Sequence, residues 1–141
     1  MTAAGSARAE RERLGSVDAL LWEYARRGEE LDLAAGMDID WDDPGYGTAD
    51  RSVSADTVRD LLRNAAALDP RGVRLRGARL VGTLDVEGVS TGFILVLRDC
   101  DLPGGVVARD AVAVALRMPG CRLSLATLFV AGFTGAVRRP G

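Results

Sequence analysis

The sequence predicts a mainly β fold: a short right-handed quadrilateral β-helix from about residue 71 onward, capped by N-terminal α-helical segments. Two observations predict it. Large apolar residues recur every five positions, and the same five-residue blocks return after 21 or 22 residues. A period near 20 with strand-like alternation inside it is typical of a solenoid. We therefore divide the chain into residues 1–70, an arm and cap with an acidic loop, and residues 71–141, the β-helix.

Length and composition restrict the kind of protein. The 141 residues are 48% apolar and 27% charged, enough to bury a core in one domain. There is no His, which excludes a His-based triad, and two Cys cannot form a four-Cys zinc site. The longest uncharged stretch, residues 123–137, has 15 residues, whereas a membrane-spanning helix needs about 20. We expect no secretory signal, no integral membrane segment and a cytoplasmic protein with reduced thiols.

The first expected element is a helix that Ser16 caps, with Asp18 at the positive end of the helix dipole. Gly28 follows two arginines and is typical of a helix end. Residues 31–33 alternate apolar and acidic side chains, which predicts a short strand. The apolar side of the helix is formed by residues at helical spacing, namely Val17, Leu20, Leu21 and Tyr24.

A second helix is expected from about residue 55 to residue 64, with Ser54 as its cap. It directly precedes the first coil of the β-helix, so we expect it to cover one end. Its buried side is predicted to consist of Val58, Leu61 and Leu62.

An acidic loop, residues 38–45, lies between the two helices. Its alternating aspartates are typical of calcium loops, but the sixth and twelfth positions are Asp43 and Ala49 where an EF-hand needs Gly and Glu. The calcium interpretation stays open. We favour a solvated turn with Trp41 packed against the rest of the protein.

Charge is divided unevenly. Residues 1–70 contain eight Arg and fifteen acidic residues, whereas residues 71–141 contain ten Arg and five acidic residues. Either the two halves pair inside the protein, or they form surfaces for two partners. The arginines of the second half are spread singly, so we expect no nucleic-acid partner.

The repeats in residues 71–141 have strand-like alternation, which predicts four short faces per square turn and parallel stacking about 4.8 Å apart. An ordinary β-sandwich with coincidental spacing is the alternative. The residues that carry the longer interval are Leu75, Leu97 and Met118 in one series and Leu80, Leu102 and Leu123 in the other.

These blocks resemble those of pentapeptide-repeat proteins, in which a small residue comes first and a large apolar residue third. The small positions are Ala78, Cys100, Cys121, Ala126 and Ala131, and the central ones are Leu80, Leu102, Leu123, Leu128 and Phe133. Over most of residues 20–135 the chain is similar to actinobacterial pentapeptide-like proteins often labelled membrane-associated oxidoreductases. The resemblance implies a β-helix. It also leaves two alternative functions, a topoisomerase-binding DNA mimic and an oxidoreductase.

Few residues of the sequence suggest a catalytic or redox role. Cys100 and Cys121 occupy equivalent positions one turn apart, and we expect them to be protonated packing residues in the core. Asp99, Asp101 and Asp110 are expected on solvated faces, where they have no reason to act as acid and base. We therefore expect no catalytic residue, no cofactor and no enzyme.

The C-terminal end of the predicted β-helix is expected to lack a cap, because no helical pattern follows Phe133. Such an end exposes strand edges and core side chains, and a second copy is the simplest cover. We expect a homo-oligomer, most simply a homodimer, with contact residues Phe129, Val130 and Phe133. The predicted function is a non-catalytic, self-associating interaction scaffold for a protein partner that the sequence does not identify.

Overall fold

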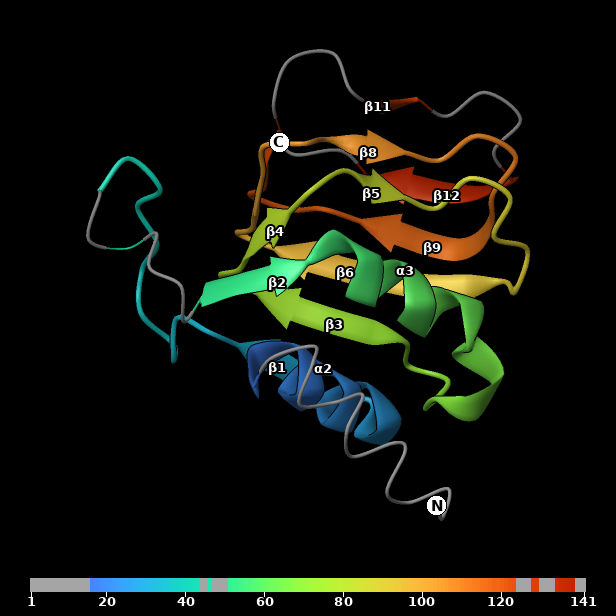
Figure 1. Cartoon of the computed structure of the whole chain (residues 1–141), viewed down its shortest axis with the longest axis horizontal. Coiled ribbons are helices and arrows are strands. Elements are labelled where there is room, and N and C mark those ends of the chain that lie inside the picture. The colour runs from blue at the N-terminus through green and yellow to red at the C-terminus, as the bar shows by residue number, and fades with distance from the viewer. Residues whose placement is uncertain (1–15, 44–45, 47–50, 124–127, 130–133, 139–141) are drawn as a thin grey trace, which may run out of the picture.

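A computed structural model describes residues 16–43, 46, 51–123, 128–129 and 134–138 (Figure 1). Within these residues the structure has two α-helices and many short strands, which pair in parallel in open sheets. The mainly β class is thereby confirmed in its coarse form. None of the described helices is long and apolar enough to cross a membrane.

The N-terminal half supplies both helices and two short strands. Helix α2 ends one residue before Gly28, whose φ of 67° is the left-handed conformation that ends helices. The two helices and the first strand lie within one or two residues of their predicted positions. In chain order the elements are α2 (Ser16–Arg27), β1 (Glu30–Asp32), β2 (Ser52–Ser54), α3 (Ala55–Arg63) and the 3₁₀ helix η2 (Ala65–Ala67).

The second half consists of short strands that are distributed among three sheets. Sheet A has the order β1-β3-β6-β9-β12, sheet B the order β10-β7-β4-β2 and sheet C the order β11-β8-β5. The strands are β3 (Val73–Arg76), β4 (Arg79–Val81), β5 (Leu84–Asp85), β6 (Phe93–Arg98), β7 (Asp101–Leu102), β8 (Val106–Val107), β9 (Val112–Arg117), β10 (Arg122–Leu123), β11 (Leu128–Phe129) and β12 (Thr134–Arg138).

Consecutive strands fall into triplets that contribute one strand to each sheet. The triplets are β3–β4–β5, β6–β7–β8 and β9–β10–β11, and β12 adds a further strand to sheet A. Leu75 is the register partner of Leu97, and Leu102 is the partner of Leu123. The 21- and 22-residue intervals therefore predicted parallel pairing correctly. Their physical cause is that equivalent apolar side chains fill one core.

Among the described residues each triplet has three strands, whereas the predicted square turn has four short faces. After β5 the chain passes through turns at Gly88 and Gly92, both with positive φ. Backbone hydrogen bonds still continue between the triplets here, since Val86 N donates to Val107 O and Val112 N donates to Val89 O. The sequence leaves the five-residue pattern in this segment, and the regular strands are lost with it.

One core cluster joins the two halves of the chain. It includes Leu21 of α2, Leu61 of α3, Leu75 of β3 and Cys121. Figure 1 shows α2 in front of β1 and below β3, and α3 in front of β6. The buried side of α3 contains Val58, Leu61 and Leu62 as predicted. The second helix therefore covers one end of the stacked strands, and α2 packs against β1, β2 and β3 at the same end, as expected of N-terminal helical segments.

Candidate interaction surface

At the N-terminal end, helices and side chains occupy the edges of the stacked strands. Strand β5 is the terminal strand of sheet C, and α3 packs beside it. The guanidinium of Arg59 donates to the carbonyl oxygen of Asp85 in β5. A carbonyl that has no strand partner on this side is thus bonded by the helix.

At the edge of sheet B, a side chain of α2 bonds the terminal strand in the same way. Asp18 of α2 accepts a hydrogen bond of 2.9 Å from the amide of Ser54, the last residue of β2. Burial raises the pKa of the Asp18 carboxyl, and the hydrogen bond from Ser54 offsets only part of this effect. The predicted cap is wrong in its detail: Ser54 holds the N-cap position of α3, but its side chain makes no capping hydrogen bond.

At the C-terminal end, strands β10, β11 and β12 are the last members of their sheets. No strand among the described residues pairs with their outer edges. Phe129 lies in β11 at this end, where only its backbone is described. Val130 and Phe133, the other predicted contact residues, lie outside the described residues.

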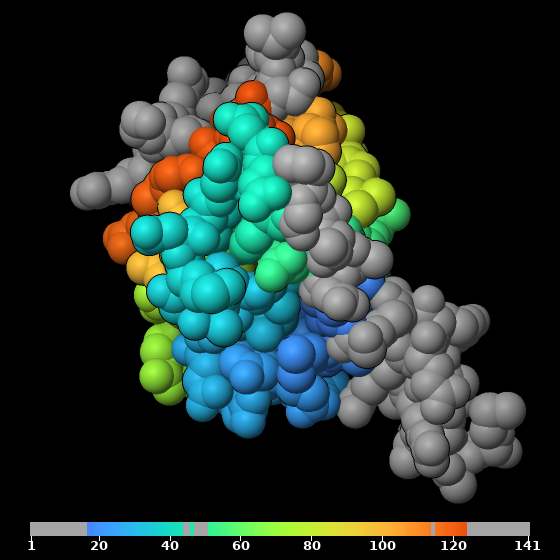
Figure 2. All heavy atoms as spheres, turned by 90° about the vertical axis from the view of Figure 1, so that its left-hand side faces the viewer, coloured from blue at the N-terminus to red at the C-terminus, as the bar shows by residue number. Residues whose placement is uncertain are grey.

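Between the two ends, the acidic loop runs along the corners that join sheet A to sheet B. Trp41 Nε1 donates to the carbonyl oxygen of Asp99 at 2.9 Å, and the ring of Trp41 lies edge-on to Tyr46. Asp42 forms an ion pair of 2.7 Å with Arg122. Figure 2 shows this loop, in cyan, extending from the blue of α2 and β1 to the orange of later strands. The predicted packing of Trp41 against the rest of the protein is confirmed.

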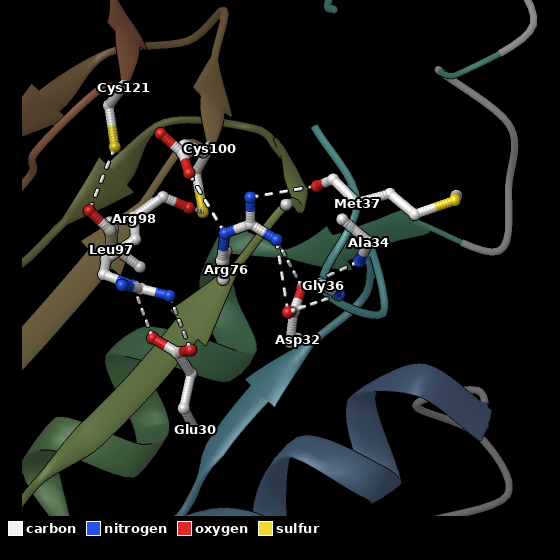
Figure 3. A network of polar contacts seen from close by, with 12 residues as sticks. Glu30, Asp32, Ala34, Gly36, Met37, Arg76, Leu97, Arg98, Cys100 and Cys121 are labelled. Atoms are coloured by element: carbon white, nitrogen blue, oxygen red, sulfur yellow. Dashed lines mark hydrogen bonds and ion pairs between the residues drawn. The ribbon is translucent and has the colours of Figure 1, made fainter. Parts of the chain in front are cut away.

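Arg76 is the centre of a polar network at the first corner (Figure 3). Its guanidinium donates to Asp32 at 3.1 Å, to Asp99 at 3.0 Å and to the carbonyl oxygen of Met37 at 3.0 Å. Burial alone raises the pKa of Asp32. Hydrogen bonds from the Gly36 and Ala34 amides and from Arg76 more than offset this, so the pKa lies below its usual value. The network fastens β1 and the following turn to β3.

The first residues of β4, β7 and β10 are basic, acidic and basic in turn. Asp101 accepts from Arg79 at 3.0 Å and from Arg122 at 3.2 Å. Asp101 is 4% exposed, so the expectation that it is solvated is wrong. Arg79, Asp101 and Arg122 hold equivalent block positions, and their alternating charges were the signal that the sequence analysis missed. The Asp101 pairs lie within the second half of the chain, whereas Asp32–Arg76 and Asp42–Arg122 join the acidic first half to the basic second half, so the two halves do pair internally.

The two cysteines lie in the core as predicted, and both are free thiols. The thiol of Cys121 donates to the carbonyl oxygen of Leu97 at 3.2 Å, and the thiol of Cys100 donates to that of Leu75 at 3.7 Å. Because Leu75 and Leu97 are register partners, the two cysteines repeat one contact in successive triplets. Burial raises the pKa of the Cys100 thiol, which keeps it protonated at neutral pH.

The charged side chains described above bind one another or backbone groups and so hold segments of the chain together. Among the described residues, no three acidic or cysteine side chains converge on a point where a metal ion would bind. A cavity of about 290 Å³ between η2 and the first residues of β3 and β6 is lined mostly by apolar residues, and Asp69 is its one titratable group.

No family model matches the chain, and no similar curated protein or solved structure is found.

Proposed function

We propose that this protein is a non-catalytic interaction scaffold that self-associates through the outer edges of β10, β11 and β12, and that it acts in the cytoplasm. The observation that carries the proposal is the difference between the two ends of the sheets. Helices, Arg59 and Asp18 occupy the edges at one end, whereas no described strand pairs with the edges at the other. An open edge is a template for another strand.

The proposed scaffold is a short right-handed β-helix of the pentapeptide-like kind. Three features support it: each triplet contributes one strand to each sheet, all pairing is parallel, and the register follows the 21- and 22-residue intervals. In a solenoid of this kind every turn contacts only its neighbours, so an end turn without a cap needs a partner. A two-fold axis at this end would place each edge strand antiparallel to its copy.

The test is the oligomeric state of the full chain, measured by sedimentation equilibrium from low to high micromolar concentration. We expect a reversible dimer. Replacing an apolar side chain by a charged one at the contact, Phe129→Asp or Phe133→Asp, should shift the chain toward monomer. The matched control is Val81→Asp, which places the same charge on β4 at a side chain that is 57% exposed, on a strand that β7 separates from β10.

A monomer at high micromolar concentration would overturn self-association. So would a dimer that Val81→Asp weakens as much as Phe129→Asp does, because the contact would then lie elsewhere. Circular dichroism of each variant separates loss of the dimer from loss of the fold.

A further inference from the structure

The outward side of sheet A carries a column of arginines that runs across its strands. Inward-facing residues such as Leu95 and Leu97 are fully buried, and the residues between them point away from the core. Backbone register aligns Glu30, Arg74, Val96 and Arg117 in this outward column, one residue from each of β1, β3, β6 and β9.

Two members of the column have no acidic partner within the described part of the chain. Arg117 is exposed and Arg74 is half-buried, yet neither forms a hydrogen bond or ion pair with a described residue. Val96 lies between them and is 7% exposed although it points outward. Arg74 and Arg117 thus lie on either side of a nearly buried valine, and Glu30, the carboxylate beside Arg74 in the column, is bound to Arg98 instead.

The neighbouring column shows which ligand chemistry this surface accepts. Arg98 binds the Glu30 carboxylate through two nitrogens, at 2.8 and 3.0 Å, and Arg76 binds Asp32 (Figure 3). Both carboxylates come from β1, the strand at the edge of sheet A. The Arg98–Glu30 pair has the fork geometry of a guanidinium on a carboxylate, whereas Arg76 reaches both oxygens of Asp32 through one nitrogen. The chain therefore already holds two carboxylates on the same face.

We propose that the column formed by Arg74, Val96 and Arg117 binds an acidic helix of a partner protein. Strands lie about 4.8 Å apart, so the two arginines are about 10 Å apart across the sheet. Carboxylates seven residues apart on one side of a helix are separated by about 10.5 Å. An acidic helix laid along the column would bring two glutamates to the two guanidinium groups.

A nucleic acid is the weaker candidate for the same surface. Single-stranded nucleic acids bind through aromatic side chains on which bases stack. The outward residues of β3, β6 and β9 that the structure describes are arginines, Ile94, Val96, Val112 and Ala115, with no aromatic ring among them.

The experiment measures binding of a fluorescently labelled peptide to the full chain by anisotropy at low salt. The probe is a helical peptide with glutamates seven residues apart, and its matched control carries glutamine at both positions. We expect the glutamate peptide alone to bind, with an affinity that falls as salt is added. Arg74→Gln and Arg117→Gln should each weaken binding by about tenfold, because each removes one charge-assisted pair.

The control variant is Arg63→Gln. Arg63 is exposed on α3, does not belong to the column of Arg74, Val96 and Arg117, and has no partner among the described residues. Three results would overturn the proposal: no binding of the glutamate peptide, equal weakening by Arg63→Gln, or tighter binding of a single-stranded oligonucleotide than of the peptide. The site does not need the dimer, so a monomeric chain that still binds the peptide would contradict self-association alone.

Discussion

The two ends of the stacked strands differ in what occupies their edges. At the N-terminal end, α2 and α3 pack over the core, and charged side chains bond the edge groups of β2 and β5. At the C-terminal end, β10, β11 and β12 are the last strands of their sheets. The comparison teaches that side chains and helices of the chain itself bond the sheet edges at one end, whereas at the other end no described strand pairs with the outer edges.

The largest effect should come from cutting the packing of the N-terminal end. Leu61→Ala removes a fully buried side chain of α3, and we expect it to lower the free energy of unfolding by about 2–5 kcal/mol. Leu123→Ala, in β10 at the other end, removes a half-buried side chain and should cost less. Urea unfolding of the monomer measures both. Equal costs would show that the C-terminal end is packed as firmly as the N-terminal one.

The second effect concerns one residue type in two places. Arg76→Gln removes a guanidinium that is 12% exposed and bonded to two carboxylates, and it should cost about 1.5–3 kcal/mol. Arg122→Gln also removes contacts to two carboxylates, but its side chain is 47% exposed, and we expect about 0–1 kcal/mol. The same unfolding experiment applies. A cost for Arg122→Gln that matches Arg76→Gln would place a tightly held network at the C-terminal end as well.

The periodicity of the sequence made the register of the core residues predictable, but not the hydrogen bonds and ion pairs between surface side chains. The interval from Leu75 to Leu97 predicted a register that the strands follow, because inward side chains have to fit those of the next triplet. Trp41 was predicted to pack, but its partner, a carbonyl 58 residues away, could not be read from local sequence. The ion pairs around Asp101 depend on which side chains the register brings together. That information exists only once the strands are aligned.

Acid sensitivity is expected to belong to the N-terminal end. The pKa of Asp32 is lowered in the folded protein, so its contribution to stability is present above the unfolded pKa of about 3.9 and is lost as pH falls through the folded pKa. Asp32→Asn should therefore lower stability at neutral pH and flatten the loss of stability below about pH 4. Urea unfolding between neutral and acid pH measures this slope.

Asp18 provides a control with the opposite sign. Its pKa is raised in the folded protein, so its contribution to stability grows as pH falls from the folded pKa toward the unfolded one. Asp18→Asn should make the acid loss of stability steeper, whereas Asp32→Asn makes it shallower. If both variants change the slope in the same direction, the pKa values of Asp18 and Asp32 are not shifted in the opposite directions that the structure indicates.

The smallest effect should come from the acidic loop, which contacts successive corners between the two ends. Tyr46 donates its hydroxyl to the carbonyl oxygen of Gly77 in a buried hydrogen bond of 2.9 Å, and Trp41 makes its bond to Asp99 in a half-buried setting at the next corner. Each bond contributes about 1 kcal/mol, and the more exposed one contributes less because water competes for it. Tyr46→Phe removes only the hydroxyl and should therefore cost about 1 kcal/mol in urea unfolding. Trp41→Phe removes the indole N–H together with part of the ring that lies against Tyr46 and Arg79, so its cost includes lost ring contacts as well as the hydrogen bond. A cost near zero for Tyr46→Phe would contradict a stabilising bond between this residue and Gly77.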